Sequence, residues 1–258
     1  QQPMSLRVRI LACALALIMA TSFPFSEAQY AFADVRKADV IYGETVDARG
    51  LAVAQCPSID AQFAMVMDAQ GTVYFERNAF TPAQIASITK VMTAVVALDA
   101  IDAGLVSLDT PVTVSPAAAY VGESSAGLQE GDVMDMATAL KALLVPSGND
   151  AAVAIAECVG QALINAGQAT NADPEAAFVD AMNAKATEIG CTDSIYENPH
   201  GLDFDEYAGN LHATAADIAK LVAYAMKNDL FREDVALGDT TITVTRAGQP
   251  TDVYLQAT

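Results

Sequence analysis

Positive charge is scarce in this chain of 258 residues: 13 lysines and arginines stand against 32 aspartates and glutamates, and the formal net charge is −19. Such an acidic surface repels nucleic-acid phosphates and anionic lipid headgroups, so nucleic-acid binding is not expected. Tryptophan is absent, which excludes no class of function. Charged residues make up only 17% of the chain and apolar residues 53%, which excludes a disordered polar chain and favours a globular fold.

Motifs of several common enzyme classes are missing as well. The two histidines, His200 and His212, are not accompanied by a Gly-x-Ser-x-Gly motif, so a Ser-His-Asp triad is disfavoured and both are expected to make structural hydrogen bonds. No glycine-rich phosphate loop and no convergent metal ligands occur, so neither a metal nor an organic cofactor is expected. The carboxylates offer no anchor for a paired-carboxylate glycosidase.

The N-terminus lacks an apolar run long enough for a transmembrane helix, which needs roughly 20 residues. Arg7 and Arg9 precede an apolar run over 10–20, and small residues follow at the positions where signal peptides are cut. We therefore predict a signal peptide over 1–33, cleaved after Ala33, and an exported protein. A retained anchor is the weaker alternative, and a lipoprotein site at Cys13 would lie too early.

Few cysteines remain after that cleavage: Cys56, Cys158 and Cys191, without the paired short spacings that bind zinc. In an exported protein Cys158 and Cys191 can pair, but three cysteines allow three single bridges. Buried free thiols are an equal alternative.

Turn residues and apolar runs divide the rest of the chain. Residues 34–61 mix charge, glycine and proline without periodicity, so they are interpreted as a lead-in to one domain over 62–258. Strands over 63–67 and 72–75 are predicted to form a hairpin, and alternation predicts another strand over 240–245. Helices are predicted over 83–100, 136–145, 150–165, 174–189 and 214–229.

These elements indicate an α+β fold. A hairpin, a buried central helix over 83–100, a helical middle and late strands predict an antiparallel sheet covered by helices, plus a helical subdomain. Strands near both ends of the domain imply a sheet closed by distant segments.

A serine and a lysine lie three residues apart in the first expected helix. Positions i and i+3 share a helix face, so the Lys90 amine is within reach of the Ser87 hydroxyl. A lysine with a lowered pKa can act as the base that a serine nucleophile needs. The spacing alone arises by chance about once in such a chain, and then marks a surface serine and a solvated lysine. Here, however, the run from Ile85 to Ala97 is otherwise apolar, where an unpaired lysine would be costly.

A second candidate follows Pro146, in the tripeptide 147–149. On a loop facing Ser87, Ser147 can relay a proton between base and leaving group, and the Asn149 amide can hold a substrate carbonyl. Taken alone, Ser-Gly-Asn is typical of an ordinary turn.

Together and in this order, the two motifs resemble those of penicillin-binding proteins and serine β-lactamases, whose signature is Ser-x-x-Lys, Ser-x-Asn and Lys-Thr-Gly. The wider sequence is similar to the low-molecular-mass D-alanyl-D-alanine carboxypeptidases over roughly 58–235. The segments that carry this similarity are 86–94, 127–132, 143–152 and 198–203.

The resemblance implies a β-lactamase/transpeptidase-like fold and a peptidoglycan stem peptide ending in D-Ala-D-Ala as substrate. It implies Ser87 as nucleophile, Lys90 as general base, Ser147 as proton relay and Asn149 as a substrate-binding residue. It also implies inhibition by β-lactams, an exported location in the cell envelope and no cofactor. The alternatives are a β-lactamase or esterase on the same scaffold, or a non-catalytic cell-wall-binding module if the chain truly ends at Thr258.

The third motif of the resemblance is missing. No Lys-Thr-Gly occurs in the 258 residues, and in the family this motif lies on a strand just beyond this point. We therefore expect a C-terminally truncated sequence that lacks its last active-site strands and acylates poorly. Membrane association is expected only through a C-terminal anchor that is also missing.

Overall fold

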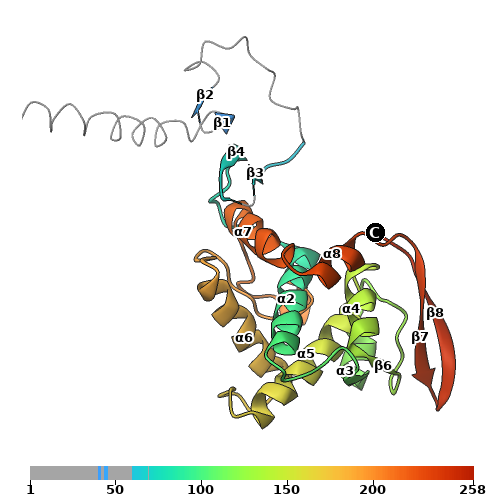
Figure 1. Ribbon diagram of the computed structural model, residues 1–258. Helices are drawn as coiled ribbons and strands as arrows, with labels where there is room; N and C mark the ends of the chain where they lie inside the picture. Colours follow the sequence, from blue (N-terminus) through green and yellow to red (C-terminus); the bar gives the residue numbers. More distant parts are fainter. Residues whose placement is uncertain (1–39, 42–43, 46–59, 69) are drawn as a thin grey trace, which may run out of the picture. The chain divides into compact units, whose positions relative to one another are not determined.

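The structure is a computed structural model that describes residues 40–41, 44–45, 60–68 and 70–258 (Figure 1). The chain divides into two compact units, 1–78 and 79–258, and each is described by itself. The predicted signal peptide, Cys56 and most of the predicted lead-in lie outside the described residues.

The described residues of the first unit form two antiparallel strand pairs. Strand β1 (Val40–Ile41) pairs with β2 (Glu44–Thr45), and β3 (Ala64–Met67) pairs with β4 (Val73–Arg77). The second pair is the hairpin that the sequence predicts.

The hairpin turn is held by its own side chains. Asp68 accepts hydrogen bonds from the backbone amides of Gln70 (3.0 Å) and Thr72 (2.8 Å), as an aspartate at the start of a turn does. Gly71 has a φ of +87°, a conformation that glycine adopts without steric cost. The turn residues therefore fix the register of β3 on β4.

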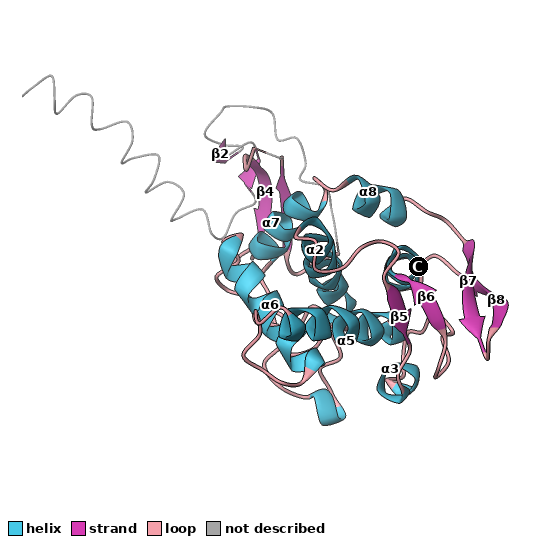
Figure 2. Ribbon diagram, turned by 60° about the horizontal axis from the view of Figure 1, so that its bottom comes forward, coloured by secondary structure: helices cyan, strands magenta, loops and turns pink. Residues whose placement is uncertain are grey.

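The second unit contains far more helix than strand, and α2 (Thr89–Asp102) is its central helix. It packs against α4 (Met136–Leu144), α5 (Asn149–Asn165), α6 (Pro174–Glu188) and α7 (Ala215–Ala225), and Figure 2 shows α5 alongside α6. Its side chains are buried almost all round, as the sequence predicts for a central helix. The ends of α2 and α5 are therefore well supported positions for reactive side chains.

The central helix begins later than predicted. A 3-10 turn, η3 (Ala86–Ile88), precedes α2, and Ala83 pairs with Ala213 in an isolated β-bridge. Ala86 has a φ of +44°, which lies outside the right-handed α-helical region. The prediction of helix from residue 83 was therefore wrong, and Ser87 lies in a tight turn just before the α-helix.

The predicted helix over 214–229 is two helices. The first, α7, ends at Ala225, and the second, α8 (Asp229–Val235), begins after Asn228, whose side chain accepts a hydrogen bond from Phe231 N. Asparagine at a helix N-cap starts a new helix in this way. The sequence analysis also missed the short helices α3 (Pro116–Tyr120) and η4 (Asp205–Tyr207).

One four-stranded antiparallel sheet lies in this unit, in the order β5 (Pro111–Thr113), β6 (Val133–Asp135), β7 (Thr240–Arg246), β8 (Gln249–Leu255). Only β7 was predicted. The sheet joins distant segments of the chain, as the sequence predicts, because β7 pairs with the internal strand β6.

An ion pair between Arg246 and Asp132 stabilises the pairing of β7 with β6. The two strands share a single register pair, Val133 with Thr245. Next to it, the Arg246 guanidinium donates from Nε (2.8 Å) and from Nη2 (2.6 Å) to the two carboxylate oxygens of Asp132, which is fully buried. Such a two-bond arginine–carboxylate contact fixes geometry as well as adding energy.

Cys158 and Cys191 are both free thiols, so the disulfide alternative for this pair is not observed. Burial raises the pKa of both thiols, that of Cys191 to about 11, which makes them poor nucleophiles. Within the described ranges, no helix combines the length and the apolar character that crossing a membrane requires.

Candidate active site

Ser87 is presented to solvent at the start of the central helix. It lies in η3, and both Ala86 before it and Ile88 after it are also exposed. The positive φ of Ala86 turns the chain sharply at this point. Backbone strain of this kind costs about 1–3 kcal/mol and is found mainly where the surrounding structure holds a functional residue in place.

Lys90 lies directly behind this serine. Its amine donates hydrogen bonds to Ser87 Oγ (2.9 Å) and to the carbonyl oxygen of His200 (3.1 Å), while only 3% of the residue is exposed. The predicted contact of amine and hydroxyl is thus present in the structure, across one helical turn. A hydroxyl that is accessible on one side and contacts a buried base on the other has the arrangement of a nucleophile.

The environment of Lys90 favours its neutral form. Burial lowers its pKa from 10.5 to about 8, and the Asp150 carboxylate acts in the opposite direction. A neutral amine can accept a proton from Ser87, whereas an ordinary surface lysine would be charged at any physiological pH. The lysine is therefore suited to general base catalysis.

The loop over 198–202 holds the other side of this turn. Asn198 Oδ1 accepts hydrogen bonds from the amides of His200 (3.2 Å) and Gly201 (2.6 Å), and the Pro199 carbonyl accepts one from Thr93 Oγ1 (2.6 Å). From the sequence, this segment was recognised only as part of the family resemblance, and no site role was predicted for its residues. Its available signal was the run Asn-Pro-His-Gly, in which asparagine and glycine are typical of a structured turn.

The two histidines make the backbone hydrogen bonds that the sequence analysis expected. His200 Nδ1 accepts from Leu202 N (3.1 Å), and His212 Nδ1 lies 2.7 Å from the Asn210 carbonyl oxygen. Burial and, second, the charge of Lys90 lower the pKa of His200 to about 4, so this imidazole is neutral at physiological pH. His200 thus contributes its carbonyl group rather than a charge to the site.

The Ser-Gly-Asn turn lies at the start of α5. Ser147 is half-buried with a φ of +61°, and a β-carbon on Gly148 would lie 2.6 Å from the Ala142 carbonyl oxygen, so glycine is required there. Asp150 directly follows Asn149, and its charge acts on the Lys90 amine. The helices α2, which carries Lys90, and α5, which begins at Asn149, also pack against each other, so the turn belongs to the same candidate site.

Asn149 is more constrained than predicted. It is 1% exposed, its Nδ2 donates to the Gly122 carbonyl (3.0 Å) and its backbone amide donates to the Ser124 carbonyl (2.8 Å). Its Oδ1 is buried and has no hydrogen-bond partner among the described residues. The atom left available is thus an acceptor, which fits a substrate N–H or the Lys90 ammonium better than the substrate carbonyl that we expected it to hold.

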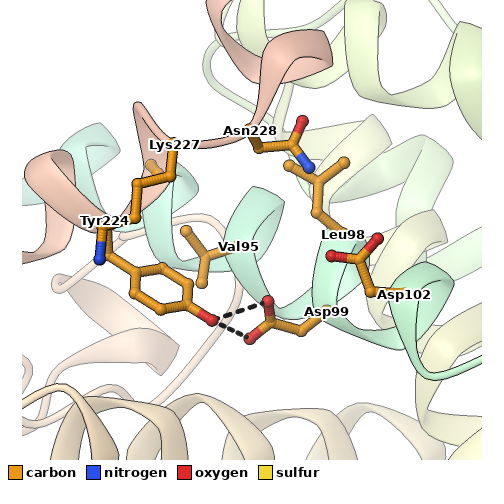
Figure 3. A pocket seen from close by; sticks show the side chains of 8 residues that line it. Val95, Leu98, Asp99, Asp102, Tyr224, Lys227 and Asn228 are labelled. Carbon is orange, nitrogen blue, oxygen red and sulfur yellow. Dashed lines mark hydrogen bonds between the residues drawn. The ribbon is translucent and has the colours of Figure 1, made fainter.

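A cavity of about 210 Å³ at the other end of α2 is a poor alternative site (Figure 3). Tyr224 Oη donates to the Asp99 carboxylate (3.1 and 3.3 Å), and Lys185 Nζ lies 2.7 Å from the same carboxylate. Tyr224 and Asp99 are therefore hydrogen-bonded to each other, and Lys185 forms an ion pair with Asp99. The lining contains no serine or cysteine: it consists of Val95, Leu98, Asp99, Asp102, Tyr224, Ala225, Lys227 and Asn228.

The described residues contain no group of three histidine, cysteine, aspartate or glutamate side chains that is arranged to hold a metal ion. The chemistry of the Ser87 site depends on a hydroxyl, an amine and hydrogen-bond donors, which are the components of acyl transfer through a serine ester.

Comparisons with known proteins point to the same chemistry. The family model described as D-alanyl-D-alanine carboxypeptidase matches residues 51–237. D-alanyl-D-alanine carboxypeptidase DacC of Escherichia coli K12 is 32% identical over 203 residues, which cover 76% of this chain and 46% of that protein. DacF of Bacillus subtilis is 31% identical over 154 residues, or 60% of this chain and 36% of that protein.

Solved structures give the same result for the fold. The crystal structure of the Streptomyces K15 DD-transpeptidase superposes with a TM-score of 0.66 at 27% identity, covering 79% of this chain and 74% of that one. The D-alanyl-D-alanine carboxypeptidase DacD of Francisella tularensis gives 0.62 at 30% identity, covering 79% and 47%. The predicted β-lactamase/transpeptidase-like α+β fold is therefore confirmed.

The chain spans less than half of the length of the curated relatives DacC and DacF. The matched region nevertheless includes the Ser87 turn, the Ser-Gly-Asn turn and the loop over 198–202. Because the family model extends over most of the chain and over these three segments, the chain belongs to the D-alanyl-D-alanine carboxypeptidase family.

Proposed function

We propose that this protein is a serine-type D-alanyl-D-alanine carboxypeptidase that acts on peptidoglycan stem peptides ending in D-Ala-D-Ala. The observation that carries the proposal is the 2.9 Å contact between the buried Lys90 amine and the accessible Ser87 hydroxyl. The membership of the family supplies the substrate class. The acidic surface is consistent with a partner other than nucleic acid.

In the first half-reaction, neutral Lys90 accepts the proton of Ser87 while Ser87 Oγ attacks the carbonyl carbon between the two D-alanines. The C–N bond then breaks, and the departing D-alanine takes up a proton that Ser147 relays. Asn149 orients the substrate through its free Oδ1. The product of this step is an ester between Ser87 and the shortened peptide.

In the second half-reaction, a water molecule attacks this ester, its proton passes to the base, and Ser87 Oγ is released with a proton of its own. A β-lactam enters the same first step, because its strained amide takes the place of the peptide bond. Its leaving group stays attached to the acyl chain, so the ester persists, and β-lactams inhibit the enzyme.

The site as described supplies the nucleophile, the base and the Ser-Gly-Asn turn. The 258 residues contain no Lys-Thr-Gly, the motif that carries the substrate-carboxylate contact in this family.

The test is covalent labelling by a fluorescent penicillin, followed by mass spectrometry of the labelled peptide. Wild-type protein is expected to carry the label on Ser87, and Ser87→Ala is expected to carry none. Equal labelling of the two proteins would remove Ser87 from its role. Turnover of a D-Ala-D-Ala peptide and of a penicillin, measured in parallel, separates a carboxypeptidase from a β-lactamase on the same scaffold.

A further inference from the structure

Asp150 is a buried carboxylate that takes no part in the reaction steps proposed above. It follows the Ser-Gly-Asn turn in the first turn of α5, and it is 1% exposed. Its oxygens accept four hydrogen bonds. The donors are Ser125 Oγ (2.6 Å), Ala126 N (3.0 Å), Leu128 N (3.1 Å) and its own neighbour Ala151 N (2.8 Å).

Three of these donors belong to one loop, over 122–128, that is more than twenty residues away in the sequence. The same loop contacts the active-site turn at three further points. Its Gly122 and Ser124 carbonyls accept from Asn149, and Ser124 Oγ donates to the Pro146 carbonyl (3.0 Å). The loop and the turn are thus joined on both sides of Asn149, and Asp150 accepts three of the six hydrogen bonds between them.

The anchoring contacts of Asp150 are strong ones. Hydrogen bonds to an ionised carboxylate are roughly twice as strong as those between neutral groups. A buried carboxylate that lost them would be left with a desolvation penalty, so the loop cannot leave Asp150 at low cost. The position of Ser147 and Asn149 therefore depends on Asp150 being both present and charged.

The charge of Asp150 also acts on the base. Burial lowers the pKa of Lys90, and the nearby Asp150 carboxylate partly offsets this effect. On the opposite side of Lys90 the facing titratable group is His200, which burial keeps neutral. Asp150 is thus the charged group that opposes the larger effect of burial on the pKa of Lys90.

We propose that Asp150 is a positioning residue of the acylation site, which clamps the loop over 122–128 onto the Ser147–Asn149 turn and presents a fixed negative charge to Lys90. This inference rests on the proposed function only in taking Lys90 as the base. The clamp and the charge are both properties of the folded protein and can be measured without substrate.

The main variant is Asp150→Asn, which keeps the shape of the side chain and removes its charge. The matched control is Asp217→Asn. Asp217 is also a buried carboxylate (2% exposed) in the first turn of a helix, and it holds a loop through Asp193 N (2.8 Å) and Ser194 Oγ (2.9 Å). Its ionic partner is Lys220 rather than Lys90.

The readout is the titration of the Lys90 side chain by NMR of protein with isotope-labelled lysine. The chain has six lysines, so the signals can be assigned with one Lys90 variant. Asp150→Asn is expected to lower the midpoint of the Lys90 titration by about half a pH unit or more, and Asp217→Asn is expected to leave it unchanged. The pH dependence of penicillin acylation should shift in the same direction, with a several-fold lower maximal rate.

An unchanged Lys90 midpoint in folded Asp150→Asn would overturn the proposal, whether or not the protein reacts with penicillin. Absence of acylation in the wild type would instead contradict the proposed function alone. Ser125→Ala is the second variant, because it keeps the charge and removes one donor to the clamp. It is expected to speed hydrogen exchange at the Ala126 and Leu128 amides, and if Asp150→Asn does not fold, unchanged exchange in Ser125→Ala overturns the proposal.

Discussion

Gly201 lies directly against the carbonyl oxygen of Ala86, so a β-carbon on Gly201 would overlap that oxygen. Its φ of +93° is a further reason why only glycine fits. Ala86 immediately precedes Ser87, and the next carbonyl before Gly201, that of His200, accepts from Lys90. The loop over 198–202 thus contacts the nucleophile turn and the base at the same time.

Gly201→Ala is expected to push the loop away from the Ser87 turn. We expect the rate of acylation by penicillin to fall by at least about tenfold, and the free energy of unfolding to fall by about 2–4 kcal/mol from overlap and strain together. Stopped-flow labelling and chemical denaturation measure the two effects. The control is Gly190→Ala, since Gly190 also has a positive φ (+78°) but its β-carbon would meet nothing within 4 Å. That variant should lose about 1 kcal/mol and keep its acylation rate; a loss of rate equal to that of Gly201→Ala would refute the argument.

The rate of acylation is expected to rise with pH and to level off above about pH 8. Lys90 must be neutral to accept the Ser87 proton, and its pKa is lowered to about 8, first by burial. Between pH 6 and pH 7.5 the second-order rate constant should therefore increase nearly tenfold for each pH unit. A profile that is flat across this range would show that Lys90 is not the base.

Lys90→Met is expected to abolish acylation and to stabilise the fold at neutral pH. The lysine pKa is 10.5 in the unfolded chain and about 8 when folded, so between these values the unfolded state binds the extra proton and stability increases with pH. At pH 7 the buried charge therefore costs stability, and we expect the methionine variant to gain about 1–2 kcal/mol after its lost hydrogen bonds are counted. Urea denaturation at pH 7 and pH 10 should show this gain shrinking as the pH rises; an advantage independent of pH would contradict the assignment.

Asp234→Asn is expected to stabilise the protein as well. Asp234 is 2% exposed, its Oδ2 has no hydrogen-bond partner in the described part of the chain, and burial raises its pKa to about 6. Its folded form thus keeps a proton between about pH 4 and pH 6, and stability is lost as the pH rises through this range. Thermal denaturation at pH 7.5 should show a gain of about 1–3 kcal/mol that disappears near pH 4. The neighbouring exposed carboxylate gives the control: Glu233→Gln should change stability by less than about 0.5 kcal/mol.

Export makes a simple prediction about the N-terminus. The charged start, the apolar run over 10–20 and the small residues before Asp34 are the features of a cleaved signal peptide. Mass spectrometry of protein recovered from the cell envelope is expected to find Asp34 as the first residue. An intact N-terminal peptide in that fraction would contradict cleavage.

The positions of the long helices could be predicted from the sequence. The short strands and the start of α2 could not, because they depend on contacts between residues that are far apart in the chain. Spacing placed α4, α5 and α6 within one residue at each end, because their apolar faces and caps are local features. Strands β5 and β6 have three residues each, too few for any period to show, and they are defined by pairing with each other across an intervening helix and loop. The late start of α2 is set by the pairing of Ala83 with Ala213, which no local pattern reveals.

The same division applies to the candidate site. Ser87 and Lys90 could be paired from their spacing, because one helical turn brings them together whatever surrounds them. The roles of Gly201 and Asp150 could not be predicted, because glycine and aspartate are common residues. Their partners are also remote in sequence: Gly201 lies against Ala86, and Asp150 binds the loop over 122–128. Asn149 was predicted as a substrate-binding residue, but the sequence could not show which of its side-chain atoms lacks a partner, because the Gly122 carbonyl that accepts from its Nδ2 is remote in sequence.

The hydrogen bond between Lys90 and the His200 carbonyl spans 110 residues of chain. During synthesis, a growing polypeptide that has reached only its first hundred residues carries the serine and the lysine but not the segment that encloses the amine. In that water-exposed state the ammonium is protonated, and the hydroxyl beside it is as inert as that of any free serine. If Ser87 is the nucleophile that we propose, its reactivity toward acyl groups therefore arises late, as a product of tertiary folding, and we expect an unfinished chain not to react with a penicillin.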